Sequence, residues 1–416
     1  MSFAPSSDAA AQALHERYRQ VRAHTLALAA PLSAEDQCIQ SMPDASPTKW
    51  HLAHTTWFFE TVLLQRHAPG YVLRDERLHY LFNSYYEALG PRHPRPLRGL
   101  ITRPGLDEVM AFRQHVDAAV EQLLQHADDA LLAQITPIIE LGLNHEQQHQ
   151  ELLLTDILHA FSCNPLLPAY LVKRQPVTSA PLRWLAQPGG VVDIGMPADS
   201  GQFCFDNETP RHQVLLQPYA IANRLVTCGE FAAFIADGGY QRADLWLSDG
   251  WATVRAQDWR HPAYWLAPDD PRRPFQQRDD LPADRWWVFG LDGVQALQAD
   301  APVAQLSFYE AAAYAAWADA RLPTEFEWEA ACNAAGITQW DDQVWQWTRS
   351  SYDPYPRFEP LEGIAAEYNG KFMVSQVVLR GGSVATPAGH TRPTYRNFFP
   401  PAARWQFSGV RLARDL

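Results

Sequence analysis

The sequence lacks most of the features that mark proteins which bind nucleic acids or membranes. Only Lys49, Lys173 and Lys371 among its 416 residues are lysine, and its formal net charge is −13. Because a surface of net negative charge repels phosphates, we expect no nucleic-acid partner. No apolar run approaches the ~18 residues that span a membrane, and residues 1–10 show no signal segment. We therefore expect no membrane partner either.

Motifs built on cysteine and glycine are also missing. The five cysteines are scattered and odd in number, and no two are spaced as CxxC. This pattern offers no zinc finger or disulfide framework and favours a reducing, cytoplasmic location. The chain has no P-loop and no GxGxxG after an apolar strand, so it lacks both common motifs for binding nucleotide phosphates.

The composition that is present suits a globular protein of two or three domains. Hydrophobic residues make up 47% of the chain and charged residues 19%, which provides material for large cores. Of the fifteen tryptophans, only Trp50 and Trp57 precede Trp184. The boundaries that this shift indicates are 1–165 for a first domain, 166–185 for a proline-marked linker and 186–416 for a second domain.

The first domain is predicted to be helical. Apolar residues recur at the spacing of amphipathic helices in four segments, 8–29, 47–67, 106–128 and 132–161. Four such helices predict an antiparallel bundle. Residues 71–104, between the second and third segments, are expected to form a long irregular excursion.

The second domain has short strand-like runs, such as 190–194, between many Gly, Pro and Asp residues. Short helices are expected near 228–237 and 308–318. Thr324 is predicted to cap a further helix, with Glu327 bonding back to the cap. The fold class predicted for the whole chain is therefore α+β multidomain, with a helical bundle followed by a loop-rich domain of short strands.

Two histidines mark the last helix of the bundle as half of a metal site. His145 and His149 are four residues apart, so on a helix they lie on one face, one turn from each other. The other members of this predicted buried seam are Ile138, Gly142, Leu152 and Asp156. Imidazole is poorly suited to an apolar seam unless something binds it. A pair of hydrogen-bonded core histidines is the alternative interpretation.

An earlier histidine cluster offers a third ligand. The seam spacing recurs at Trp50, His54, Trp57, Thr61 and Leu64. His54 is therefore predicted to face into the bundle beside the pair, whereas His51 lies one turn away and slightly off the seam. Three neutral imidazoles from two helices would leave open positions for substrate and oxygen. A site of two histidines and one carboxylate, from Glu60 or Glu151, is the competing arrangement.

Longer motifs resemble a known family. RLPTEFEWEAA, WQWTRS, LRGGS and FSGVRLA are similar to the formylglycine-generating-enzyme-type domain, which has a C-type-lectin-like fold. WHLAHTTWFFE and NHEQQHQE resemble the DinB-type four-helix bundle. Over essentially the whole chain, this fusion resembles the EgtB-type sulfoxide synthases of ergothioneine biosynthesis.

The resemblance implies a mononuclear non-haem Fe(II) enzyme with His54, His145 and His149 as metal ligands. The implied reaction uses O2 to join the sulfur of a cysteine donor to C2 of the imidazole of hercynine (Nα-trimethylhistidine), and it gives a sulfoxide. Gln148 and Asn397 match the positions at which the family binds hercynine.

The residues after Asn397 depart from the better-known members of the family, which have Trp-Asp there. The aspartate of those members helps to hold a γ-glutamyl-cysteine donor, and this chain has Phe398 and Phe399 instead. An aromatic wall without a carboxylate favours the smaller donor L-cysteine. The rings are also suited to face the trimethylammonium group of hercynine.

Two further sets of residues are candidates for the site, the tyrosines through the resemblance and the arginines through their charge and their place nearby in the sequence. Tyr85 and Tyr86 match paired tyrosines of the cysteine-using branch and are the expected catalytic residues, because a phenol can deliver a proton. Arg92 and Arg95, together with Arg98, are expected to form a fork for the carboxylate of the donor.

Other reactions remain open. The donor is γ-glutamyl-cysteine or a selenium compound in one alternative. In another, the bundle is a DinB-type metal-dependent hydrolase or thiol transferase, and the lectin-like half is a binding module. A formylglycine-generating enzyme would need two cysteines near LRGGS, and none follows Cys332. The sequence predicts no particular oligomeric state.

Overall fold

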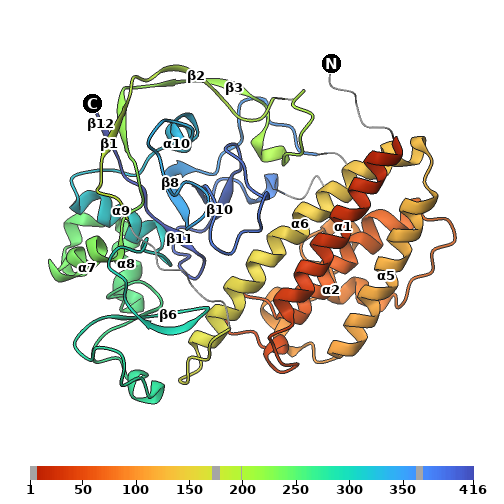
Figure 1. Cartoon of the computed structure of the whole chain (residues 1–416), viewed down its shortest axis with the longest axis horizontal. Coiled ribbons are helices and arrows are strands. Elements are labelled where there is room, and N and C mark those ends of the chain that lie inside the picture. Colours follow the sequence, from red (N-terminus) through yellow and green to blue (C-terminus); the bar gives the residue numbers. More distant parts are fainter. Residues whose placement is uncertain (1–6, 171–178, 198, 362–368) are drawn as a thin grey trace. The chain divides into compact units, whose positions relative to one another are not determined.

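The computed structural model describes residues 7–170, 179–197, 199–361 and 369–416. The chain forms two compact units, Met1–Cys163 and Asn164–Leu416. The first is built of helices, and the second of short strands and short helices (Figure 1). The predicted α+β class, a helical bundle followed by a second domain with strands, is confirmed.

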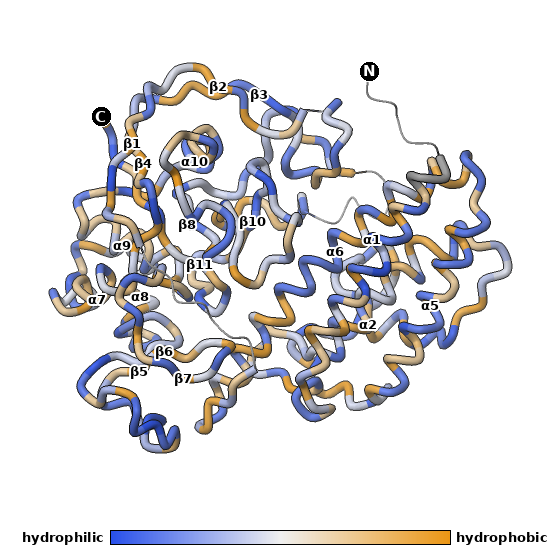
Figure 2. Tube along the Cα trace, viewed as in Figure 1, coloured by the Kyte–Doolittle hydropathy of each residue, from blue (hydrophilic) through white to orange (hydrophobic). Residues whose placement is uncertain are grey.

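The helices of the first unit include four long ones that form the predicted bundle. Its helices are α1 (Ser7–Ala29), α2 (Thr48–Phe58), α3 (Gln65–His67), α4 (Arg77–Phe82), α5 (Leu106–His126) and α6 (Asp129–Ser162). Helix α6 packs against α1 and α2, and α5 packs against α2. Figure 2 shows polar and apolar residues alternating along α1, α5 and α6, as expected for amphipathic helices. None of the described helices combines the length and the apolar character that crossing a bilayer requires.

Helix α2 is enclosed by the bundle rather than lying on its surface. All of its side chains are buried, so the prediction that it is amphipathic was wrong. It continues from Phe58 through a π-helical segment, Phe59–Leu64, into α3. Such π-turns inside helices are rare and occur frequently at functional sites. The seam predicted through α2 and the π-helical segment is buried, as are the other residues of both segments.

Helix α6 carries the HxxxH motif. Its first turn is capped by Asp128, whose carboxylate accepts a hydrogen bond from the backbone N–H of Leu131 at 2.8 Å. Four members of its predicted seam are buried and two, Ile138 and Leu152, are only half-buried. Gly142 lets the Phe59 ring lie directly against the helix, because a Cβ at this position would come within 2.6 Å of that ring.

The segment predicted as an irregular excursion, 71–104, contains helix α4. Leu78 and Phe82 are four residues apart on this helix, and they are 7% and 1% exposed. They therefore pack into the bundle as one apolar stripe. The sequence did not predict this helix, because six residues are too few for the apolar spacing of a helix to recur.

The second unit contains four small sheets among its described residues, with strand orders β1-β4-β12, β10-β9-β8-β11, β2-β3 and β5-β6-β7. The strands are β1 (Trp184–Gln187), β2 (Gly190–Ile194), β3 (His212–Leu216), β4 (Tyr219–Ala222), β5 (Trp265–Leu266), β6 (Trp287–Gly290), β7 (Gly293–Ala296), β8 (Trp345–Ser351), β9 (Val377–Arg380), β10 (Asn397–Phe399), β11 (Ser408–Gly409) and β12 (Ala413–Asp415). The helices are α7 (Cys228–Ala236), α8 (Ser248–Gln257), α9 (Phe308–Trp317) and α10 (Glu325–Ala331). The sequence predicted α7 and α9 closely and missed α8.

Reciprocal caps begin three of these helices. At α10 the Thr324 hydroxyl accepts from the Glu327 N–H at 3.1 Å, and the Glu327 carboxylate accepts from the Thr324 N–H at 2.8 Å. The predicted capping box is therefore confirmed. The same arrangement begins α7 and α9. These local hydrogen bonds fix the residue at which each short helix starts.

Candidate metal centre

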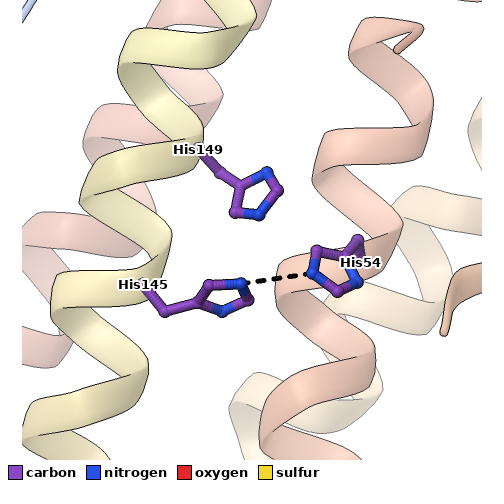
Figure 3. Close-up of side chains that lie close together, drawn as sticks. All are labelled: His54, His145 and His149. Atoms are coloured by element: carbon purple, nitrogen blue, oxygen red, sulfur yellow. Dashed lines mark hydrogen bonds between the residues drawn. The ribbon is translucent and has the colours of Figure 1, made fainter. Parts of the chain in front are cut away.

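The three predicted histidine ligands meet inside the helical bundle. His54 projects from α2, and His145 and His149 project from α6 into the space between the two helices (Figure 3). One nitrogen from each ring lies within 4.8 Å of the others, and all three side chains are buried. Nε2 of His54 is 3.2 Å from Nε2 of His145. Among the described residues, this is the only group of three or more potential ligands that is close enough to hold one metal ion.

The His54 ring is held on both sides and along its edge. Trp50 stacks on it with ring centroids 4.5 Å apart, and Trp57 with centroids 5.5 Å apart. Nδ1 donates a hydrogen bond to the carbonyl oxygen of Phe82 at 2.7 Å. A neutral imidazole has one N–H, so Nε2 of His54 keeps its lone pair. The ring is therefore fixed with Nε2, the nitrogen available to a metal, towards His145.

Burial keeps the three imidazoles neutral. It lowers the pKa of His145 to about 3, and it lowers the pKa of His54 and His149 well below the ordinary value. The neighbouring histidines lower the pKa of His54 and His149 further. Because only a neutral imidazole binds a metal, the site is prepared for an ion without prior loss of a proton.

The donor set fits a metal with free coordination positions. Two nitrogens that each lie ~2.1 Å from one ion at right angles are ~3.0 Å apart, close to the 3.2 Å between the Nε2 atoms of His54 and His145. Imidazole is a suitable ligand for iron, zinc, copper and nickel. Three nitrogens from the protein leave room for further ligands.

A buried ionic network anchors α6 next to the HxxxH motif. Glu146 follows His145 directly, is 0% exposed and accepts hydrogen bonds from Arg22 at 2.8 Å, Arg113 at 2.5 Å and the Thr25 hydroxyl at 2.6 Å. These bonds tie α6 to α1 and α5. They hold the rotation of α6, and therefore the direction in which His145 points.

The competing carboxylate ligands do not join the histidine group. Glu60 accepts a hydrogen bond from the Tyr71 hydroxyl at 2.6 Å, and burial raises the pKa of its carboxyl. Glu151 is half-buried on α6. Within the described residues, neither belongs to the group that could share an ion.

The predicted catalytic tyrosines lie close to the aromatic residues that surround the site. Tyr86 is fully buried, with its ring centroid 5.7 Å from that of Trp57 and 6.5 Å from that of Phe58. The Phe58 ring in turn lies 4.8 Å from His145. Tyr85 is half-buried and stacks on Tyr86 at 4.6 Å.

The three arginines of GPRHPRPLR differ in environment. Arg92 is half-buried and donates to Glu87 at 2.9 Å, and Arg95 is exposed and donates to the carbonyl oxygen of Asp44 at 2.5 Å. Arg98 is only 3% exposed. Its guanidinium carbon lies 3.4 Å from the centroid of the Trp50 ring, whose other contacts include His54.

The other predicted binding residues lie on two elements. Gln148 is half-buried on α6, beside His149. In the second unit, Asn397, Phe398 and Phe399 form β10, which pairs antiparallel with β9. The Asn397 side chain accepts from the N–H of Phe398 at 2.8 Å.

Two contacts to the histidines were not anticipated from the sequence. The contact with the backbone carbonyl of Phe82 cannot be read from the sequence, because every residue has a backbone carbonyl. Asp156 accepts a hydrogen bond from His51 and does have a signal, since it follows His149 by seven residues on the same face of α6.

Comparison with known proteins gives the same division into two parts. Residues 17–153 match the DinB superfamily, and residues 169–343 and 332–416 match the sulfatase-modifying factor enzyme 1-like domain. The chain is 30% identical over 442 residues to a hercynine oxygenase of Mycobacterium tuberculosis, an alignment that covers 95% of this chain and 97% of that protein. It is 30% identical over 431 residues to a hercynine oxygenase of Mycolicibacterium thermoresistibile, covering 90% and 88%. A formylglycine-generating enzyme of Mycobacterium tuberculosis is 35% identical over 168 residues, which cover 38% of this chain and 54% of that enzyme.

Proposed function

The chain belongs to the family of EgtB-type hercynine oxygenases, which are oxidoreductases, and on this premise we propose that it is an Fe(II)- and O2-dependent sulfoxide synthase. The proposed reaction joins the sulfur of L-cysteine to C2 of the hercynine imidazole and gives hercynylcysteine sulfoxide, a step of ergothioneine biosynthesis. The observation that carries the proposal is the buried group of His54, His145 and His149, whose neutral rings are suited to hold one metal ion.

We assign His54, His145 and His149 as the ligands of Fe(II). Bound iron would supply a position for the soft thiolate of the donor and the redox chemistry with O2 that no side chain provides. The surrounding residues exclude water, because Trp50, Trp57 and the whole of α2 are buried.

Hercynine is assigned to Gln148 and Asn397 through the motifs they share with the family. Its trimethylammonium group is suited to an aromatic face, where a desolvated cation–π contact contributes on the order of 1–2 kcal/mol. The Phe398 ring is already stacked on Tyr352, with centroids 4.1 Å apart and planes 13° apart. Phe399 meets Trp405 edge to face, so we favour Phe399 for this contact.

The carboxylate of L-cysteine is assigned to Arg98, with Arg92 and Arg95 nearby in sequence. Arg98 forms no ion pair with a carboxylate among the described residues, and it donates to the hydroxyls of Ser46 at 2.9 Å and Ser84 at 3.1 Å. Burial, and then Arg95, lower its pKa to about 8. A buried cation without an anionic partner is destabilising, and a bound carboxylate would relieve that cost.

Tyr86 is our preferred catalytic residue of the Tyr85/Tyr86 pair. Its ring contacts Trp57 and Phe58, which in turn contact His54 and His145. We propose that its hydroxyl delivers a proton during oxygen transfer to sulfur. Tyr85, which stacks on it, would hold the ring in place.

A competition assay tests the reaction and the choice of donor. Fe(II)-loaded protein is given hercynine with equal amounts of L-cysteine and γ-glutamyl-cysteine in the presence of O2, and the products are identified by mass spectrometry. We expect mainly hercynylcysteine sulfoxide, and the Tyr86→Phe variant should form less of it at unchanged iron content. A predominant γ-glutamyl product would refute the donor assignment. Undiminished sulfoxide formation by the variant would remove Tyr86 from the mechanism.

A further inference from the structure

A chain of hydrogen bonds joins His149 to Asp156 through His51. His149 and Asp156 are seven residues apart on α6, so they lie on the same face two turns apart. His51 reaches them from α2. Its Nδ1 lies 2.8 Å from Nδ1 of His149, and its Nε2 lies 3.0 Å from Oδ2 of Asp156. The exposed fractions are only 2% for His51, 9% for His149 and 6% for Asp156.

The carboxylate end of this chain determines where each hydrogen lies. Oδ2 of Asp156 also accepts from the backbone N–H of Ser46 at 2.8 Å, and an ionised carboxylate only accepts. Nε2 of His51 must therefore carry a hydrogen. In a neutral His51, which has one N–H, Nδ1 then accepts and Nδ1 of His149 donates. Nε2 of His149 is left with its lone pair.

A backbone hydrogen bond gives His54 the same tautomer. There the carbonyl of Phe82 accepts from Nδ1 and leaves the lone pair on Nε2. Metal-binding histidines commonly donate their other N–H to a carbonyl or a carboxylate in this way. For His149 the carboxylate acts through a second imidazole.

His159 shows how an ordinary half-buried histidine in the same helix differs. Its Nδ1 lies 2.7 Å from the hydroxyl of Ser41, which can either donate or accept. That contact does not determine a tautomer. The contact of His51 with a carboxylate does.

We propose that Asp156 and His51 are positioning residues that hold His149 in the tautomer whose Nε2 binds the metal. The inference rests on the proposed three-histidine metal site. Because His51 lies on the same helix as His54, the relay also links the two helices that carry the ligands.

The Asp156→Leu variant tests the relay by removing the acceptor at a similar side-chain size. Asparagine is unsuitable, because its amide oxygen could still accept from both Ser46 and His51. Without an acceptor at this position, Nε2 of His51 no longer has to carry the hydrogen, and Nδ1 of His51 no longer has to accept from His149. Two readouts follow this loss. One is the ¹⁵N chemical shift of the His149 ring in metal-free protein, assigned with His149→Gln. The other is the dissociation constant of Fe(II), measured without O2. We expect the wild-type ring to carry its hydrogen on Nδ1, and the variant to bind Fe(II) about 10–100-fold more weakly.

Asp117→Leu is the matched control, because Asp117 lies in the same bundle but accepts from Tyr18 and Arg22 rather than from a histidine. Its Fe(II) affinity should equal that of the wild type. Equal affinity and an unchanged tautomer in Asp156→Leu would overturn the relay alone. A wild type that binds no Fe(II) would overturn the proposed function and the relay together. If Asp156→Leu does not fold, the wild-type spectrum decides, since a hydrogen on Nε2 of His149 contradicts the relay.

Discussion

At the scale of single residues, the geometry of the candidate metal centre depends on residues other than the three histidines. Trp50 and Trp57 confine the ring of His54, and the carbonyl of Phe82 selects its tautomer. Glu146 points away from the histidines and into an ionic network. These residues fix the orientation of His54 and anchor the helix that carries His145, which the spacing of the histidines alone does not.

Glu146 gives a prediction about acid stability. Burial alone would raise the pKa of Glu146, but Arg113 and Arg22 lower it to about 2. A carboxylate whose pKa is lower in the folded state stabilises fully above its ordinary value near 4.5, and this stabilisation disappears as the pH falls towards about 2. The shift corresponds to about 3 kcal/mol. Glu146→Gln should therefore lower the free energy of unfolding near pH 7 by about 3–5 kcal/mol.

Urea unfolding of the whole chain, followed by helical circular dichroism, measures this effect. The difference between wild type and Glu146→Gln should shrink as the pH falls below about 4.5. Glu121→Gln is the control, because Glu121 pairs with Arg19 at the surface, where such pairs contribute little. A difference that stays constant with pH, or a control that loses as much stability, would rule out this role for Glu146.

At the scale of elements, α2 and α6 must approach closely for the histidines to meet. Gly142 lies one turn before His145, and a Cβ there would come within 2.6 Å of the ring of Phe59 and 3.1 Å of the ring of Phe58. Phe59 is fully buried, so its ring cannot move aside into solvent to make room for a Cβ. The close contact of these helices therefore requires glycine at this position.

We expect Gly142→Ala to separate α2 from α6. Overpacking costs about 1–3 kcal/mol, which the better helix propensity of alanine offsets by only about 1 kcal/mol. The separation should also weaken Fe(II) binding, because His54 and His145 lie on the two helices. Titration of metal-free protein with Fe(II) and thermal unfolding check both effects. Gln134→Ala, at an exposed position of α6, controls for helix propensity, and Fe(II) affinity in Gly142→Ala equal to that of this control would contradict the account.

The elements also show how far the sequence alone could lead. The long helices and the caps were predictable, because their signals repeat over many residues or consist of local pairs such as Thr324 and Glu327. Helix α4 was not predictable, since its only signal is a single apolar pair. The full burial of α2 was not predictable either, because it depends on packing by helices distant in sequence. Spacing favoured His54 as the neighbour of His145 and His149 only weakly, and the resemblance to the family selected it. The contacts of His51 with His149 and Asp156 required the arrangement of α2 against α6.

At the scale of the whole molecule, two units of different architecture carry the residues assigned to one reaction. The helical unit holds the candidate metal ligands, the tyrosines and Arg98, and the second unit holds Asn397 and the two phenylalanines of β10. The family to which the chain belongs combines the same two domain types. The two-domain class was predictable from composition, whereas the reaction was reached only through resemblance.

The central claim is that this chain performs oxygen chemistry on hercynine at an iron held by three histidines. The most direct test measures O2 uptake by the Fe(II)-loaded chain with hercynine and L-cysteine together and with each alone. The account predicts rapid uptake only when both are present, and none after His145→Gln. Uptake that does not depend on hercynine, or none at all from protein shown to contain iron, would contradict it and would favour a hydrolase or transferase of the DinB type.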